Sequence, residues 1–255
     1  MAGAWLALLA AALVPLGAEA GQGRCPSGNT IPLPPPGSPA ANTPEPLAKP
    51  WEAANAAPPA AAADYRHRLR PTAYGWPRLD HWCVWVEPAQ ASGPAARWEQ
   101  PWLEAVDAAL GQWSRLVPIT RVESPEQAQV RIWRRRPPLR GGRASHGRAE
   151  LMVVLRQHPD GNSRPEPLVQ VSLGTGQRQQ ALQATALHEL GHAFGLWGHS
   201  DQPGDAMAAV PGPDPVLELS QRDRATFRWL QQQPALALPL ELPRARGAGS
   251  STAPH

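Results

Sequence analysis

The sequence lacks several features that would place it in a class at once. Its 255 residues include one lysine, two cysteines, two tyrosines and two phenylalanines. Two cysteines are too few for a disulfide-dense small protein or for a zinc module built from four thiolates. Beyond the first twenty residues no apolar run approaches the length of a membrane-spanning helix, so we expect no transmembrane segment.

Charge gives little indication of a nucleic-acid partner. The formal net charge is only +3, although the pI is about 9.4. The densest positive patch has no interleaved aromatic residues, which nucleic-acid grooves often contain. We therefore expect no nucleic acid, and we interpret the patch as a solvated loop, with a site for acidic polymers or an anionic surface as the alternative. The patch consists of Arg134, Arg135, Arg136, Arg140, Arg143 and Arg148.

Composition divides the chain into four regions. Residues 1–20 contain an apolar stretch followed by Ala18-Glu19-Ala20, which predicts a cleaved signal peptide and a secreted or extracytoplasmic protein. An uncleaved anchor is the alternative. Residues 21–63 are rich in proline and alanine and are expected to form a disordered spacer. Residues 64–233 form the expected folded domain, and residues 234–255 a disordered tail.

Hydrophobic periodicity predicts strands and helices that alternate along the folded region. This alternation favours an α+β or α/β class with a mixed sheet. Ser220 is expected to cap a helix that extends to about Gln232. The expected strands cover residues 82–87, 117–122, 128–133, 150–156 and 168–173, and the longer helices cover residues 98–116 and 179–194.

The most informative segment is HELGHAFGLWGHSD, which begins at His188. His188 and His192 lie four residues apart on one helical face, so both imidazoles can reach one Zn²⁺ at about 2.0–2.1 Å. Glu189 can then take a proton from zinc-bound water, whose pKa the metal lowers toward about 7. Gly195 is expected to end the helix in a left-handed conformation and let His199 supply a third nitrogen. Three protein ligands plus water predict one catalytic Zn²⁺.

This segment and its flanks resemble the metzincin metallopeptidases, and among them the matrixins most. Asp205-Ala206-Met207 is similar to the family's Met-turn, which places Met207 beneath the metal. Residues 113–132 are similar to a first helix followed by two strands, and residues 219–230 to the closing helix. The resemblance implies a metzincin-like (zincin) α+β fold with a twisted mixed five-stranded sheet, two long helices and a small C-terminal subdomain. Trp197, in the ligand loop, is a candidate for the border of the substrate cleft.

The sequence departs from the matrixin pattern at the third histidine. The family spacing would place that histidine at position 198, which is Gly198 here, and His199 follows one residue later. Gly198 could absorb the extra residue as a bulge, or Asp201 or Asp205 could ligate the metal instead. Two alanines follow Met207 where matrixins usually carry tyrosine and proline. The segment that holds a structural zinc and calcium in animal matrixins is not recognisable, which leaves one zinc ion.

Cys25 and Cys83 leave three interpretations open. In an exported protein they could form a disulfide that ties the spacer to the first strand, or they could remain unpaired thiols. Cys25 also resembles the matrixin propeptide cysteine that keeps those enzymes latent, with Arg24 before it as the motif requires but Pro26 where glycine is expected. The tryptophans are expected to fill a core poor in phenylalanine and tyrosine rather than to form a sugar-binding strip.

Our first hypothesis is a secreted, monomeric zinc endopeptidase that hydrolyses peptide bonds. Glu189 would act as general base and then as proton donor to the leaving amine. The substrate would be an extended polypeptide along a sheet edge near residues 150–155. The alternatives are a zinc-stabilised, non-catalytic binding or adhesion module, which has no use for Glu189, and a gluzincin-like peptidase with Glu218 as the distant ligand.

Overall fold

The computed structural model describes residues 25–26, 28–34, 63–89, 93, 96–139 and 145–238. The expected signal peptide, most of the expected spacer and the end of the expected tail lie outside these residues. Among the described residues, no helix has both the length and the apolar character that crossing a bilayer requires.

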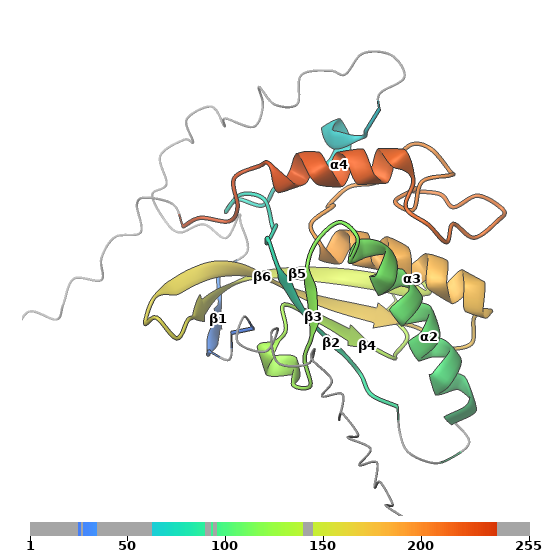
Figure 1. Cartoon of the computed structure of the whole chain (residues 1–255), viewed down its shortest axis with the longest axis horizontal. Helices are drawn as coiled ribbons and strands as arrows, with labels where there is room; N and C mark the ends of the chain where they lie inside the picture. The colour runs from blue at the N-terminus through green and yellow to red at the C-terminus, as the bar shows by residue number, and fades with distance from the viewer. Residues whose placement is uncertain are drawn as a thin grey trace, which may run out of the picture.

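A mixed sheet of six strands forms one layer of the fold (Figure 1). The strands are β1 (Thr30–Pro32), β2 (Trp82–Val86), β3 (Ile119–Arg121), β4 (Val130–Trp133), β5 (Gly147–Gln157) and β6 (Ser163–Leu173). Their order across the sheet is β1-β5-β6-β4-β2-β3. Strands β3, β2, β4 and β6 are parallel, whereas β5 runs antiparallel to β6, and β1 antiparallel to β5. The expected α+β class with a mixed sheet is confirmed.

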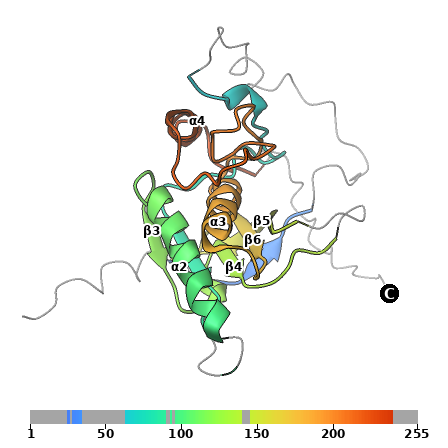
Figure 2. The ribbon, with the colours of Figure 1, turned by 90° about the vertical axis from the view of Figure 1, so that its right-hand side faces the viewer.

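Helices α2 (Ala96–Trp113) and α3 (Gln179–Ala193) pack side by side against the sheet, as Figures 1 and 2 show. Helix α4 (Gln221–Gln231) lies at the end of the molecule away from the sheet. It begins where the sequence predicted, because Ser220 Oγ accepts a hydrogen bond from the backbone N–H of Asp223 in a capping box. Two short 3₁₀ helices, η2 (Arg66–Arg68) and η3 (Pro125–Gln127), complete the elements.

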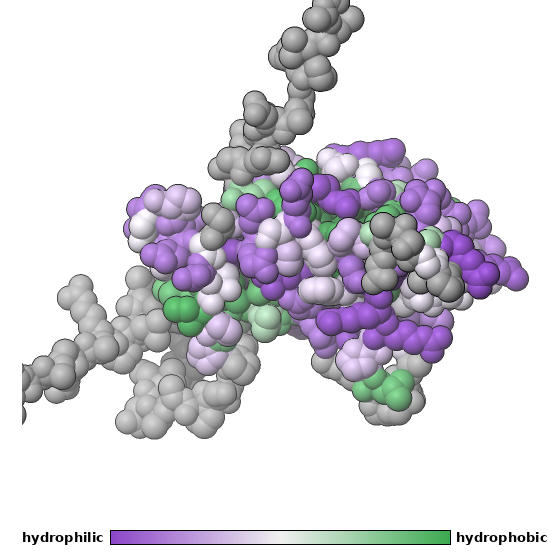
Figure 3. Space-filling view, turned by 90° about the horizontal axis from the view of Figure 1, so that it is seen from below, coloured by the Kyte–Doolittle hydropathy of each residue, from purple (hydrophilic) through white to green (hydrophobic). Residues whose placement is uncertain are grey.

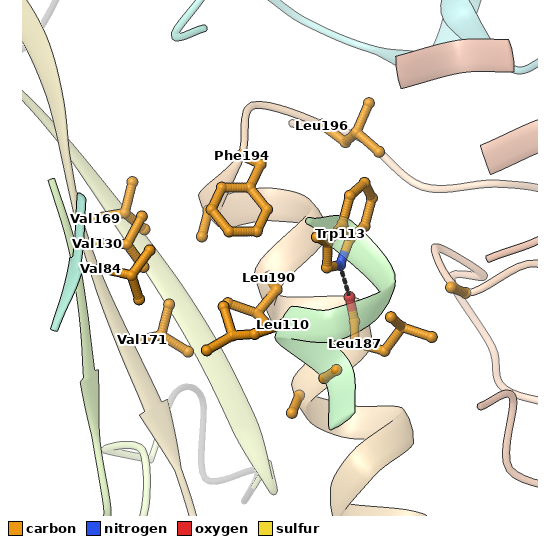
Figure 4. Close-up of a cluster of buried hydrophobic side chains, with 14 of the residues drawn as sticks. Val84, Leu110, Trp113, Val130, Val169, Val171, Leu187, Leu190, Phe194 and Leu196 are labelled. Atoms are coloured by element: carbon orange, nitrogen blue, oxygen red, sulfur yellow. Dashed lines mark hydrogen bonds between the residues drawn. The ribbon is translucent and has the colours of Figure 1, made fainter. Parts of the chain in front are cut away.

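The core lies between the sheet and helices α2 and α3 (Figure 4). Valines from three strands, among them Val84, Val130 and Val169, point toward leucines and aromatic rings on the helices. The indole of Trp113 donates a hydrogen bond of 3.1 Å to the Leu187 carbonyl and so ties α2 to α3. The underside of the molecule is mostly hydrophilic, with only small hydrophobic areas (Figure 3).

The tryptophans fill this core largely as predicted. Of the six tryptophans at positions 76, 82, 85, 98, 102 and 113, four are at most 3% exposed and Trp85 is 8% exposed. Trp98 is the exception, because it lies in the first turn of α2 and is 54% exposed. The buried ones are Trp76, Trp82, Trp85, Trp102 and Trp113.

Strand β1 corrects two expectations. It lies inside the region predicted to be a disordered spacer, and it makes the sheet six-stranded instead of five-stranded. A three-residue strand that contains a proline has no detectable periodicity, so no local pattern predicts it. The expected C-terminal tail is also ordered at its start, where Ala235 bridges to Trp76 and the Ala237 N–H donates to the Tyr74 carbonyl at 2.8 Å.

Three of the four described arginines of the positive patch are not simply solvated, and the fourth, Arg136, is exposed. Arg134 is almost buried, lies 3.2 Å from the Glu99 carboxylate and stacks over the Trp102 ring. Arg135 donates to Ser172 Oγ at 3.1 Å, and Arg148 to the Pro138 carbonyl at 2.8 Å. These three side chains therefore attach the loop to the sheet and α2. Arg140 and Arg143 lie outside the described residues.

A disulfide joins Cys25 to Cys83 across 58 residues of sequence. It attaches the segment before β1 to the middle of β2, which is the first of the three interpretations that the sequence left open. Both cysteines are used in this bond. Cys25 is therefore not a free thiol that could ligate a metal, and the latency interpretation is wrong for this state of the protein.

Removing this disulfide is expected to destabilise the fold substantially. Closing a 58-residue loop restricts the unfolded chain, and the chain-entropy relation gives about 4 kcal/mol for that length. We expect the Cys25→Ser/Cys83→Ser double variant to lose about this much free energy of unfolding in urea titrations. The natural chain, titrated after reduction, is the matched control and should show the same loss. An unchanged urea midpoint in both would contradict the prediction.

Candidate metal centre

Helix α3 presents His188 and His192 on one face and then ends sharply. The backbone at Gly195 has a φ of +109°, and a Cβ there would lie 2.8 Å from the Pro77 carbonyl oxygen. Glycine is therefore required by both conformation and space. The chain reverses at this point, with the Leu196 N–H donating to the Gly191 carbonyl at 2.9 Å. The prediction that Gly195 ends the helix is confirmed.

The reversal brings the third histidine back to the first two. One ring nitrogen each of His188, His192 and His199 lies within 4.8 Å of the other two. The ring centroids are 4.9 Å apart for His188 and His192, 5.2 Å for His188 and His199, and 4.9 Å for His192 and His199. The structure thus brings together all three predicted ligands in one group that could hold a metal ion.

Gly198 makes room for the extra residue before His199. A Cβ at this position would lie 2.3 Å from the Arg68 carbonyl oxygen, so only glycine fits against that segment. The neighbouring Trp197 carbonyl accepts a hydrogen bond of 2.9 Å from the Arg70 N–H. The ligand loop is therefore held from outside by residues 68–70, which lie far from it in sequence.

Two backbone carbonyls orient the helical histidines. His188 Nδ1 lies 2.9 Å from the Ala206 carbonyl oxygen, and His192 Nδ1 lies 2.7 Å from that of Leu196. A carbonyl can only accept, so each Nδ1 carries the hydrogen and each neutral ring keeps its Nε2 lone pair for a metal. Burial lowers the pKa of His192 to about 3 and also lowers the pKa of His188 and of His199. All three rings are therefore neutral at pH 7, as metal ligation requires.

The donor set fits a transition metal such as zinc. A tetrahedral zinc site with Zn–N distances of about 2.0–2.1 Å places its nitrogens about 3.4 Å apart. The three nitrogens already lie within 4.8 Å, so small ring rotations suffice. Imidazole ligands suit zinc, copper, iron and nickel, and the geometry alone does not choose among them.

The alternative carboxylate ligands are used elsewhere. Arg222 Nη2 lies 2.8 Å from Asp201, and Arg222 Nη1 lies 2.7 Å from Asp205. Neither carboxylate belongs to the metal-ligating group, and neither does the exposed Glu218. The structure therefore gives the third position to His199 and no support to these three acids.

Glu189 lies beside this group in a largely apolar setting. It is only 9% exposed, and burial raises its pKa to about 7, an effect that the backbone amide of Ala149 and the charge of Arg148 partly offset. Glu189 and His188 line one wall of a cavity of about 530 Å³. The first residue of β5 lies against the same carboxylate, because a Cβ at Gly147 would be 2.8 Å from Glu189 Cγ.

Met207 packs directly beneath helix α3. Its side chain is fully buried, and a Cβ added at Gly191 would lie 2.1 Å from its Sδ. The Met207 carbonyl accepts a hydrogen bond of 2.7 Å from the Ser200 N–H, which ties this turn to the ligand loop. Met207 therefore supports the helical turn between the two ligands.

A Gly191→Ala variant tests that contact. The new methyl group would overlap Met207, and overpacking of this kind costs about 1–3 kcal/mol. We expect a lower urea midpoint and weaker metal binding. Gly111→Ala is the matched control, because no atom lies within 4 Å of a Cβ there; it should leave stability unchanged or raise it by up to about 1 kcal/mol. Equal midpoints for both variants would contradict the packing role.

Sequence reasoning missed the buried acid that holds the turn before Met207. Asp223 is fully buried and accepts hydrogen bonds of 2.9 Å from the Ala206 N–H and 2.7 Å from the Tyr65 hydroxyl. The carbonyl of Ala206 in turn accepts a hydrogen bond from His188. Asp223 therefore helps to orient His188 through the Ala206 backbone. The Ser220-x-x-Asp223 capping pattern could have revealed this acid, whereas no pattern marks Tyr65.

Trp197 stacks on one of the ligands. Its ring lies 5.3 Å from that of His192, with 21° between the planes. Trp197 does not line the cavity beside Glu189. Its place at the border of a substrate cleft stays a prediction.

Comparisons with protein-family models and with curated protein sequences do not identify this site. No protein-family model matches the chain, and no curated protein sequence matches it. The interpretation of the three histidines and Glu189 therefore depends on their own geometry.

Proposed function

We propose that this chain is a secreted zinc-dependent endopeptidase of metzincin, matrixin-like type. The observation that carries the proposal is the convergence of three imidazoles next to Glu189, a buried carboxylate that lines the same cavity as His188. A closed structural site would need a fourth protein ligand, and the described residues supply only three. The disulfide supports export, because such bonds persist in oxidising compartments.

The residues divide the chemistry between them. His188, His192 and His199 would hold the ion, and a bound Zn²⁺ supplies a Lewis acid that lowers the pKa of water toward about 7. Glu189, next to the first ligand, takes the proton from the attacking water and then delivers it to the leaving amine. Glu189 and His188 line the same cavity, so a substrate lying there can contact this carboxylate.

The substrate we propose is an extended polypeptide that adds to the edge of β5. From Gly147 to Met152 this strand pairs with β6 on one side, and on the other side no strand of the described part of the chain pairs with it. Backbone groups on such an edge bind an extended peptide through strand addition. The edge begins at Gly147, which lies against Glu189. A peptide bound along this edge therefore passes next to the Glu189 carboxylate.

The metzincin assignment is supported by the position of Met207 and by the helices. Met207 lies beneath the ligand-bearing turn, as the resemblance implies. Helix α3 carries the ligands, and α4 begins at Ser220 beyond the Met207 turn. The alternative, a non-catalytic zinc module, leaves the burial of Glu189 beside the ligands without a purpose.

The test uses the full chain, because β1 and Cys25 belong to the folded unit. Purified protein should contain one zinc per chain by elemental analysis and should degrade casein or gelatin. A zinc chelator should abolish the activity, and added Zn²⁺ should restore it. Stoichiometric zinc without cleavage of either substrate would favour the binding module, and absence of zinc would reject both.

A further inference from the structure

Strand β1 occupies the same edge of β5 that the proposed substrate would use. β1 pairs with β5 from Thr30 opposite Arg156 to Pro32 opposite Val154. The pairing extends one residue further at each end, with hydrogen bonds between Asn29 and Gln157 and from the Leu33 N–H to the Val153 carbonyl at 2.9 Å. The chain direction of β1 is antiparallel to β5 and leads toward Glu189.

The sequence of β1 suits a strand that pairs on one side only. Residues 29, 31 and 33 face β5, and none of them is a proline, so their backbone groups can pair. Pro32 and Pro34 stand at the alternate positions, where the N–H would point away from β5. Prolines at such positions prevent a further strand from adding, which is how edge strands are protected.

Three contacts hold β1 in place. The disulfide from Cys25 to Cys83 anchors the chain before it. Gly28 lies so close to β5 that a Cβ would be 1.7 Å from the Gln157 carbonyl oxygen. The Tyr74 hydroxyl donates to the Pro34 carbonyl at 3.1 Å after the strand ends. β1 is therefore fixed at both ends.

The remaining edge is short. By register, Pro34 is opposite Met152, and Gly147 lies against Glu189. Among the described residues, the positions left between them for another antiparallel peptide are opposite Arg148 to Leu151. Four residues of extended chain span about 13 Å. At the junction, Leu33, Pro34, Tyr74 and Met152 help to line an apolar cavity of about 480 Å³.

We propose that β1 closes the amino-terminal side of the substrate cleft, so that only about four substrate residues before the cleaved bond can pair with β5. The end of β1 forms an apolar subsite for the first of these residues. This inference rests on the proposed function and narrows its substrate class. A substrate that pairs antiparallel to β5, as β1 does, has its amino-terminal residues directed toward β1. The preferred peptide carries an apolar side chain about four residues before the cleaved bond, and longer amino-terminal extensions gain nothing.

The test is a ladder of peptides built on the casein bond that the enzyme cleaves fastest. The ladder has two, four, six and eight residues before that bond. For the natural chain, kcat/KM should rise up to four residues and then stay constant. The Ile31→Pro/Leu33→Pro variant removes two of the three backbone N–H groups that face β5 and keeps the disulfide. We expect the kcat/KM of this variant to rise about tenfold more between four and eight residues. One or two added hydrogen bonds between the longer peptide and β5 would give an increase of this size.

The matched control is Thr30→Pro, whose N–H faces away from β5; it should behave like the natural chain. Unchanged cleavage of the two-residue peptide shows that the double variant is folded. Replacing the apolar fourth residue by aspartate should lower kcat/KM about tenfold in the natural chain only. The proposal is overturned if the kcat/KM of the natural chain keeps rising beyond four residues, or if the kcat/KM of the double variant stays constant beyond four residues.

Binding separates this inference from the proposed function. If no peptide is cleaved, the peptidase proposal fails, but the same ladder with a fluorescent label can be titrated into zinc-loaded Glu189→Gln protein. A plateau in affinity at four residues, absent in the Ile31→Pro/Leu33→Pro background, supports the role of β1. Affinity that rises steadily in both backgrounds overturns it.

Discussion

Glu189→Gln is expected to lower peptide hydrolysis by about a thousandfold while one zinc remains bound, because general acid–base groups contribute about 10²–10⁴. Glutamine has nearly the same shape but cannot accept the proton of the attacking water. The three histidines are unchanged, so the metal content should be unchanged. The measurements are kcat/KM on a casein-derived peptide and zinc per chain by elemental analysis.

Glu218→Gln is the matched control for this experiment. Glu218 is exposed and lies outside the three-histidine group, so its substitution should leave both activity and zinc content as they are. Loss of zinc in this variant would instead favour the gluzincin-like arrangement. Full activity in Glu189→Gln would remove this carboxylate from the mechanism.

His199→Ala is expected to weaken zinc binding by more than about a hundredfold, a larger effect than the 10–100-fold typical of residues that only orient ligands. Two imidazoles would remain, and the described part of the chain offers no replacement, because Asp201 and Asp205 are both paired with Arg222. Activity should fall in parallel with zinc content. Competition with a chromogenic chelator measures the affinity directly.

Asp201→Asn separates His199 from Asp201, one of the two carboxylate alternatives for the third position. This change removes a charge two residues after His199 but no member of the histidine group. Zinc affinity should stay within about threefold of the natural value, as for an exposed ion pair. The opposite result, with zinc lost in Asp201→Asn and kept in His199→Ala, would reassign the ligand.

Local patterns in the sequence predicted the helices and the grouping of three histidines well. Helix α3 ends one residue earlier than expected, and α4 begins just after its predicted cap at Ser220. Helix periodicity, capping and the left-handed glycine are all determined within a few residues. The grouping of His188, His192 and His199 follows from the same local geometry, because a helix and one reversal suffice to bring them together.

The strands were harder to predict because their partners are distant. Strand β6 begins at Ser163, five residues earlier than predicted, and it contains Pro165 and Pro167 near its start. The register explains why these prolines fit. Pro165 is opposite Leu155 and Pro167 is opposite Val153, and the backbone groups of these two β5 residues face β1 instead of β6. Their missing N–H groups would point toward β4, which pairs with β6 only from Val169. No local pattern contains that information.

The remaining differences also depend on contacts between distant residues. The choice among disulfide, free thiols and latency depended on whether Cys25 could reach Cys83, which is a question of tertiary structure. Tyr65 and Asp223 form a pair across 158 residues. Gly198 suggested a bulge, but the reason that only glycine fits is the Arg68 carbonyl, which lies far away in the sequence.

The link between Cys25 and Cys83 has a practical consequence for anyone who purifies this protein. If another enzyme nicks the backbone once between Pro34 and Ala63, the two pieces stay attached through their sulfurs. Such a sample runs as one band on a non-reducing gel and as two after thiol treatment, and an affinity tag at the amino terminus still retrieves both pieces. Intact mass under non-reducing conditions increases by one water molecule, so only that increment or a reducing gel distinguishes a nicked preparation from an uncut one.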